Sequence, residues 1–136
     1  AMLLFDVPFR ETCTLRRPRT NTPLQALNLL NDPTYMEAAR FLAQRMLLEG
    51  GDRVESRLSF GFRLIMARAP RANEMAILKK SLERCLGEFQ ADQASAAAII
   101  KVGEAASDAS LQVAELAAYT SLASTMLNLD ETVTKE

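Results

Sequence analysis

The sequence contains no histidine and no tryptophan, and it has only two cysteines among its 136 residues. Without histidine, Ser-His-Asp and Cys-His catalytic arrangements are excluded, and the commonest metal ligand and the usual axial ligand of haem are missing. The sequence also lacks a C-x-x-C-H haem-attachment motif and a glycine-rich phosphate loop. It therefore predicts no catalytic, cofactor-binding or metal-binding residue.

The two cysteines, Cys13 and Cys85, lie far apart and lack the spacing of metal ligands. We interpret them as free thiols, and we expect Cys85 to face the core because it continues the apolar stripe of its helix. A single disulfide between them is the alternative if the protein is exported. The sequence does not decide between these two states.

Glycine and proline are scarce, at five residues each, and aromatic residues make up only 6% of the chain. This composition favours helices whose core is built from leucine, alanine, methionine and isoleucine. A chain of 136 residues, 49% of them hydrophobic, is long enough to bury the core of one domain. We predict an all-α fold, a bundle of about five to six amphipathic helices with an extended N-terminal lead-in.

We expect a single helical domain over residues 1–136, divided into three parts. An extended lead-in and an arginine-rich loop occupy residues 1–22, the bundle spans residues 23–129, and a polar tail follows at 130–136. The apolar residues Met2–Phe5 at the start of the chain indicate a fragment of a larger protein. An isolated fragment of this kind is expected to hide apolar surface by self-association.

Hydrophobic periodicity and turn residues predict six helices. They are expected at Pro23–Leu30, Pro33–Glu49, from an Asp52 cap to near Arg68, Ala72–Phe89, Gln93–Val102 and Leu111–Leu129. Thr22 and Gln25 have the spacing of a capping box, and so do Asp52 and Glu55. Asp32 is expected to cap the second helix.

The same periodicity predicts which side of each helix faces the core. On the second helix, Arg40 and Gln44 fall on the polar side, which we expect to face water. The last helix is apolar almost all round and is predicted to be the most buried. The residues of the first helix expected to face inward are Leu24, Leu27 and Leu30 or Leu29.

The net charge of −1 gives no reason to expect nucleic acid or an anionic membrane as a partner. The longest uncharged run, Leu116 to Leu129, is too short and too rich in Ser, Thr and Asn to span a bilayer. The charge is distributed unevenly, because residues 10–19 are basic whereas residues 86–136 are acidic. The basic cluster therefore lies at one end of the chain.

Four arginines form this cluster on a non-helical segment that precedes two helix N-termini: Arg10, Arg16, Arg17 and Arg19. Guanidinium groups pair bidentately with carboxylate, sulfate or phosphate, and helix N-termini favour anions. The cluster therefore predicts a binding site for an anionic ligand or an acidic partner. The alternative is pairing with carboxylates of the same chain, such as Asp6, Glu11 or the acidic C-terminal half. No base-stacking aromatic residues alternate with the arginines, so a nucleic-acid site is not expected.

One long segment resembles a known family: FDVPFRETCTLRRPRTNTPLQALNLLNDPTYMEAARFLAQRML, which includes the specific run RTNTPLQALNLLNDP from Arg19 to Pro33. Two further stretches agree, FRLIMARAPRANEMAIL and the closing AELAAYTSLASTMLNLDETVTKE. They resemble a planctomycete-specific domain of unknown function at the C-terminal end of large planctomycete cytochrome c-type proteins. The resemblance covers essentially the whole chain and identifies it as the C-terminal portion of that domain.

The resemblance implies an exported protein of the cell envelope, with a cytochrome c-like module and another domain of unknown function upstream. Haem would then belong to the upstream module, and no cofactor is expected in this segment. The family has no established catalytic residues that could be carried over to these positions.

Three hypotheses follow from the sequence. The first is a non-catalytic structural or interaction module that binds the upstream part of the same polypeptide through the lead-in and the arginine loop. The second is binding of an acidic protein or polysaccharide through the arginine loop. The third is an active site completed by upstream residues, to which this chain would contribute Arg19, Asn21, Asp32 and Asp130.

Overall fold

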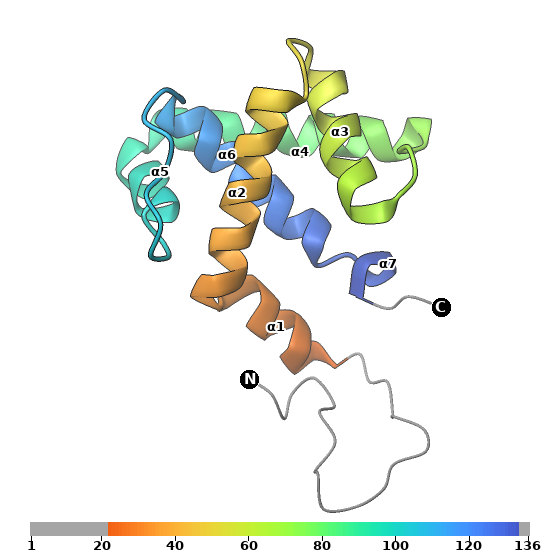
Figure 1. Ribbon diagram of the computed structural model, residues 1–136, viewed down its shortest axis with the longest axis horizontal. Helices are drawn as coiled ribbons and strands as arrows, with labels where there is room; N and C mark the ends of the chain where they lie inside the picture. Colours follow the sequence, from red (N-terminus) through yellow and green to blue (C-terminus); the bar gives the residue numbers. More distant parts are fainter. Residues whose placement is uncertain (1–21, 134–136) are drawn as a thin grey trace, which may run out of the picture.

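The computed structural model describes residues 22–133 of the chain. Within this range seven helices follow one another and there is no strand: α1 (Pro23–Asn31), α2 (Pro33–Glu49), α3 (Val54–Met66), α4 (Ala72–Ala91), α5 (Gln93–Ile100), α6 (Val113–Leu127) and α7 (Asp130–Val133). In Figure 1, α6 passes behind α2, α5 and α3 flank this pair, and α1 and α7 lie at the lower end. The predicted all-α bundle is confirmed.

Two adjacent caps fix the corner between α1 and α2. The Thr22 hydroxyl accepts a hydrogen bond from the backbone N–H of Gln25 at 3.2 Å, and the Gln25 side chain accepts one from the N–H of Thr22 at 2.8 Å. Asp32 ends α1, and its carboxylate accepts from the N–H of Thr34 at 2.9 Å to begin α2. Pro23 and Pro33 occupy first helical positions, where no donor is needed. Both predicted caps are confirmed.

The capping box predicted for α3 is wrong. This helix begins at Val54, and its N-cap is Arg53, which makes no side-chain cap hydrogen bond. Glu55 instead accepts a hydrogen bond from Lys79 of α4 at 2.7 Å. The Glu55 carboxylate, which the local pattern predicted to be part of a capping box, thus forms an ion pair with another helix.

The core is centred on α6, most of whose residues are buried. It packs most extensively against α2, then against α4 and α5. Ala39 and Ala43 of α2 are fully buried, and their small side chains let the two helix backbones approach closely. Leu122 and Tyr119 of α6 add buried volume at the centre. The prediction that the last long helix is the most buried is confirmed.

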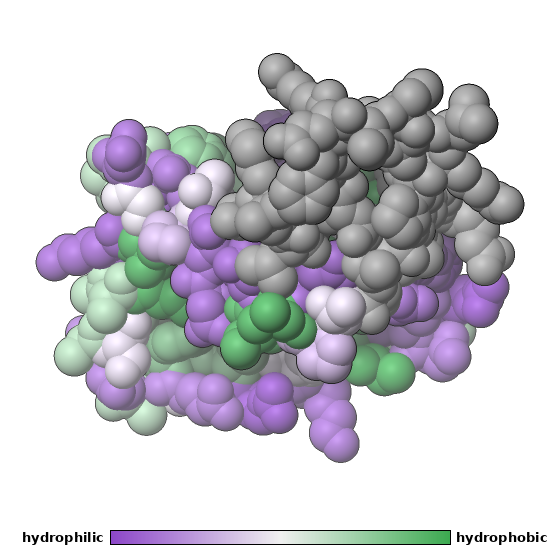
Figure 2. Space-filling model, turned by 90° about the horizontal axis from the view of Figure 1, so that it is seen from below, coloured by the Kyte–Doolittle hydropathy of each residue, from purple (hydrophilic) through white to green (hydrophobic). Residues whose placement is uncertain are grey.

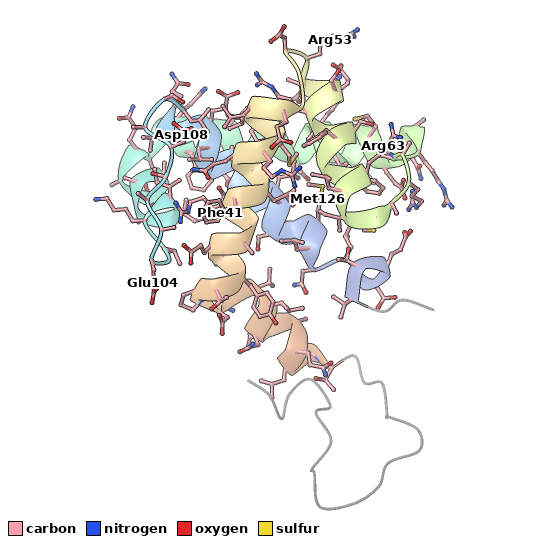
Figure 3. All side chains as sticks on the ribbon, in the orientation of Figure 1. Phe41, Arg53, Arg63, Glu104, Asp108 and Met126 are labelled. Atoms are coloured by element: carbon pink, nitrogen blue, oxygen red, sulfur yellow. The ribbon has the colours of Figure 1, made fainter. Side chains whose placement is uncertain are left out.

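Arg40 and Gln44, which were predicted to face water, are both buried, and Arg40 has no exposed surface. Arg40 is buried because the loop between α5 and α6 lies across this flank of α2 and accepts a hydrogen bond from its guanidinium at the Ala105 carbonyl. Figure 3 shows this loop, with Glu104 and Asp108, beside the flank of α2 that carries Phe41. Helical periodicity cannot predict burial of this kind, because Ala105, which covers Arg40, is 65 positions away in the chain.

The orientation predicted for α1 is wrong for all its named leucines except Leu29, the alternative to Leu30, which is half-buried. Gln25 is the residue of α1 that is buried, and Leu24, Leu27 and Leu30 are exposed. The helix carries leucines on two sides, so its periodicity alone did not distinguish the inner side from the outer one. Two contacts are made in the observed orientation. Gln25 is part of the capping box, and the Asn128 side-chain amide donates to the Ala26 carbonyl at 3.4 Å.

The tail predicted from residue 130 onward begins with α7, so this part of the prediction is corrected. The hydroxyl of Thr132 donates to the Met126 carbonyl at 2.9 Å, which folds α7 back onto the end of α6. Cys85 is a free thiol and is half-buried against the core, as predicted, whereas Cys13 lies outside the described residues. Among the helices of residues 22–133, none combines the length and the apolar character needed to cross a bilayer.

Candidate functional site

The four arginines predicted to bind an anionic partner, Arg10, Arg16, Arg17 and Arg19, lie outside the described residues, as does Asn21 of the third hypothesis. Their role stays a prediction. The two remaining residues of that hypothesis are described. Asp32 is engaged as the cap of α2, and Asp130 is the first residue of α7.

The outer side of α1 presents three leucines, which we call the α1 face. Leu24, Leu27 and Leu30 are 57%, 56% and 43% exposed, and α1 contains no charged residue. Figure 2 views the molecule from the side of α1, where apolar residues lie among polar ones. Single exposed leucines are ordinary, but three on one uncharged helix form a surface suited to contact with another polypeptide.

On the inner side of α1, opposite the α1 face, lies a recess of about 380 Å³ between α1, α2, α6 and α7, which we call the apolar pocket. Its lining is mostly apolar, and its size suits one or two inserted hydrophobic side chains. The residues that line it are Leu29, Tyr35, Ala38, Ser124, Leu127, Asn128, Thr132 and Val133. No charged side chain is among them, so a charged ligand would find no partner there.

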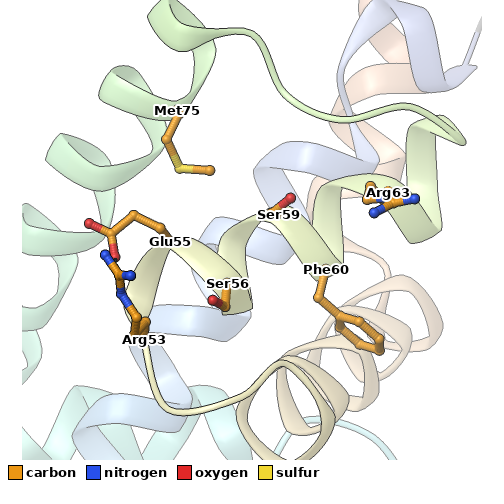
Figure 4. Close-up of a pocket in the computed structure, with 7 residues that line it drawn as sticks. All are labelled: Arg53, Glu55, Ser56, Ser59, Phe60, Arg63 and Met75. Carbon is orange, nitrogen blue, oxygen red and sulfur yellow. Dashed lines mark ion pairs between the residues drawn. The ribbon is translucent and has the colours of Figure 1, made fainter.

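A second recess, the α3 pocket, has a volume of about 460 Å³ and runs along α3 toward α4 (Figure 4). Glu55 in this pocket is paired with Lys79 at 2.7 Å and with Arg53 at 3.9 Å. The lining contains no histidine that could activate a serine as a general base. Its residues are Arg53, Glu55, Ser56, Ser59, Phe60, Arg63 and Met75. The α3 pocket offers polar contacts and no arrangement for catalysis.

Arg40 and Glu37 of α2 clamp the loop between α5 and α6. The Nη2 atom of Arg40 donates to the Ala105 carbonyl at 2.7 Å and lies 3.4 Å from Oε1 of Glu37. The same carboxylate oxygen accepts from the N–H of Ala105 at 2.7 Å. Gly103, with φ of +99°, packs so closely on Glu37 that a side chain there would collide with it. Among the described residues, the Nε and Nη1 atoms of Arg40 have no hydrogen-bond partner although they are buried.

Arg68 forms an ionic junction between the α3–α4 corner and α7, which we call the Arg68 junction. Its guanidinium donates to both oxygens of Glu131, at 2.8 and 2.6 Å, and to both oxygens of Glu74, at 2.9 and 2.8 Å. It also lies over the ring of Phe62, 5.0 Å from the centroid. Hydrogen bonds from Arg68 and from the N–H of Arg71 lower the pKa of Glu74 to about 2, and those from Arg68 lower the pKa of Glu131.

The depressed pKa of Glu74 predicts a loss of stability in acid. An unfolded chain protonates this carboxyl near pH ~4.3, whereas the folded chain keeps it ionised until about pH 2. Its contribution is therefore complete above pH ~4.3 and is lost as the pH falls toward 2. We expect Glu74→Gln to lose less stability than the wild type in thermal unfolding between pH 5 and pH 2. The exposed Glu83→Gln variant should follow the wild type, and parallel curves for all three proteins would contradict the prediction.

The described residues contain no group of three or more His, Cys, Asp or Glu side chains that could hold a metal ion. Burial raises the pKa of the Cys85 thiol, which makes it a poor nucleophile. Sequence reasoning missed both the α1 face and the Arg68 junction. The leucines of α1 were visible but were assigned to the wrong side, and no local pattern links residues 68 and 131. In this part of the chain the candidate site is a binding surface made of the α1 face and the apolar pocket.

Comparison with known proteins identifies a family. A family model described as "PSD1: Protein of unknown function (DUF1553)" matches residues 1–82, more than half of the chain. The matched region contains the run from Arg19 to Pro33 and ends within α4. No curated protein and no solved structure matches the chain.

Proposed function

The chain belongs to the PSD1 family of proteins of unknown function, and from this premise we propose that it is a non-catalytic helical interaction module that binds the upstream part of its own polypeptide. The observation that carries the proposal is the exposure of Leu24, Leu27 and Leu30 on α1, the helix that also contributes Leu29 to the apolar pocket. An uncharged apolar surface of this kind is typical of protein–protein contacts and is costly to leave in water.

The upstream polypeptide is the partner we favour because it is covalently joined at the binding surface. Residues 1–21 connect it to Thr22, the N-cap of α1, which is the helix that carries the exposed leucines. A partner in the same polypeptide would be present at a high effective concentration, so even a weak apolar contact would be occupied.

We further propose the setting that the family resemblance implies. The module would form the C-terminal part of an exported multidomain planctomycete protein that carries a cytochrome c-type module. The absence of histidine from the chain is consistent with haem being held elsewhere in such a protein. In this setting the module would support and orient the upstream domains and would carry out no reaction of its own.

The proposal predicts that the leucines stabilise the full-length polypeptide and not the 136-residue chain. In the short chain, the triple variant Leu24→Ser, Leu27→Ser, Leu30→Ser should change the free energy of unfolding little, because these side chains are already exposed. In the full-length polypeptide the same variant should be destabilised by about 1 kcal/mol per leucine, since burial of the exposed half of each side chain is lost. Urea denaturation of both proteins measures the difference.

The matched control is Ile77→Ser, which replaces a side chain that is 64% exposed on α4. It should have a small effect in both proteins. If the triple variant loses equal stability in the short chain and in the full-length polypeptide, the leucines do not contact upstream residues and the proposed function is wrong.

A further inference from the structure

We propose that α7 is a strap that the Arg68 junction holds in place as one wall of the apolar pocket, so that binding at this apolar surface depends on an ion pair. The inference rests on the proposed function and names how the same site is controlled. It is carried by the contacts of α7 with three other parts of the chain: the α3–α4 corner, the end of α6 and the lining of the pocket.

The strap is too short to be stable by itself. It comprises the four residues Asp130–Val133, and an isolated helical turn is far below the length at which helices persist in water. Its internal bonds are few: the N–H groups of Thr132 and Val133 donate to the Leu129 carbonyl at 2.9 and 3.1 Å. Its position must therefore be set by contacts with the rest of the molecule.

The strongest of these contacts is the bidentate pair of Glu131 with Arg68, at 2.8 and 2.6 Å. The arginine is itself held from two other directions, by both oxygens of Glu74 and by the ring of Phe62. Because Arg68 is already ordered, little side-chain entropy is lost when Glu131 binds, which distinguishes this pair from an ordinary surface ion pair. The Thr132 hydroxyl adds a weaker tie to the Met126 carbonyl at 2.9 Å.

The residues that follow Glu131 form the wall. Thr132 and Val133 line the apolar pocket, whose α1 and α2 sides include Leu29 and Tyr35. When Glu131 is bound to Arg68, these two residues are held against the recess and give it its shape. When the ion pair is broken, this wall is lost and the recess becomes an open surface. An inserted side chain then makes fewer contacts and binds more weakly.

This arrangement has a consequence that separates it from simple apolar association. Apolar contacts become stronger at high salt, whereas an ion pair with partners 30% and 54% exposed is screened. Raising the salt concentration should therefore weaken binding by loosening the strap, whereas it would strengthen binding that depended on the apolar lining alone.

The first test is amide hydrogen exchange over Leu129–Val133 in the 136-residue chain. We expect Glu131→Gln to raise the exchange rates of these amides at least fivefold, and 0.5 M NaCl to raise those of the wild type. Arg68→Lys, which keeps the charge and loses the bidentate geometry, should give an intermediate rate. The control is Glu88→Gln, because Glu88 forms a loose, exposed pair with Arg84 at 3.8 Å. Unchanged exchange in Glu131→Gln would overturn the inference.

The second test couples the strap to binding in the full-length polypeptide. The destabilisation caused by the triple serine variant of the α1 face should shrink when Glu131→Gln is also present, because the binding surface is then already weakened. Full additivity, together with faster exchange, would mean that the strap moves without affecting binding, and the inference would fail while the proposed function stands. A different result would be that the triple serine variant does not destabilise the full-length polypeptide when Glu131 is intact, while hydrogen exchange still depends on Glu131. That result would remove the proposed function and, with it, the role of the strap in binding.

Discussion

Replacing Gly50 by alanine is expected to lower the free energy of unfolding by about 3 kcal/mol, at the upper end of the range for an overpacked site. The backbone of Gly50 has φ of −78°, which alanine adopts freely, so the cost is steric and not conformational. An added Cβ would lie 2.7 Å from the Cα of Arg57 and closer still to the carbonyl oxygen of Met46. Both are backbone atoms: relief of the Arg57 contact requires α2 and α3 to separate, and relief of the Met46 contact requires the last turn of α2 to change.

The matched control for this substitution is Gly87→Ala in the interior of α4. No heavy atom lies within 4 Å of a Cβ added at Gly87, so alanine meets nothing there. Its higher helix propensity should stabilise the chain by about 0.5–1 kcal/mol. Urea denaturation of the two variants beside the wild type should give shifts of opposite sign. No loss in Gly50→Ala would show that the α2–α3 corner relaxes more easily than the contacts indicate, and a loss in Gly87→Ala would contradict the gain expected from helix propensity.

Arg40→Ala is expected to cost about 3 kcal/mol. The change removes a fully buried side chain from the clamp on the α5–α6 loop, leaves a cavity, and leaves the Ala105 carbonyl without its 2.7 Å donor. Truncation of one partner of a buried polar contact is costly for these reasons. Urea denaturation gives the loss, and hydrogen exchange at the amide of Ala105 should show that it is greatest at the loop.

Arg40→Met separates the volume of this side chain from its charge. Methionine fills much of the same space, and it removes the Nε and Nη1 donors that are buried without a hydrogen-bond partner among the described residues. Glu37 can still accept from the N–H of Ala105. We expect Arg40→Met to recover most of the stability lost in Arg40→Ala, to within about 1 kcal/mol of the wild type. Equal losses in the two variants would mean that the guanidinium contacts, and not the packing, stabilise the loop.

The candidate site could be predicted from the sequence only in part. The absence of histidine directed attention to binding, which stays a prediction. The run RTNTPLQALNLLNDP led to a domain family of unknown function, as the match over residues 1–82 confirms. The arginine cluster that the sequence favoured lies outside the described residues, so anion binding there stays a prediction. The surface that the fold presents instead is made of leucines that the sequence placed in the core.

What the sequence determined by itself was local. Thr22 with Pro23 and Asp32 with Pro33 specify two helix starts, because a cap and its partner N–H lie within three residues of each other. The continuous apolar character of α6 specified its burial, since no side of that helix suits water. These features follow from interactions along a few residues of chain, which is the range that periodicity and capping patterns record.

Only the tertiary structure decided which way α1 turns its leucines, why Arg40 is buried, and that Arg68 holds Glu131. Each of these depends on residues far apart in sequence: Ala26 with Asn128, Arg40 with Ala105, and Arg68 with Glu131. Whether a side chain is buried depends on which segment covers it, and the hydrophobic pattern around that side chain does not indicate the covering segment. The binding surface proposed for this chain belongs to this second class, because it exists only where α1, α2, α6 and α7 meet.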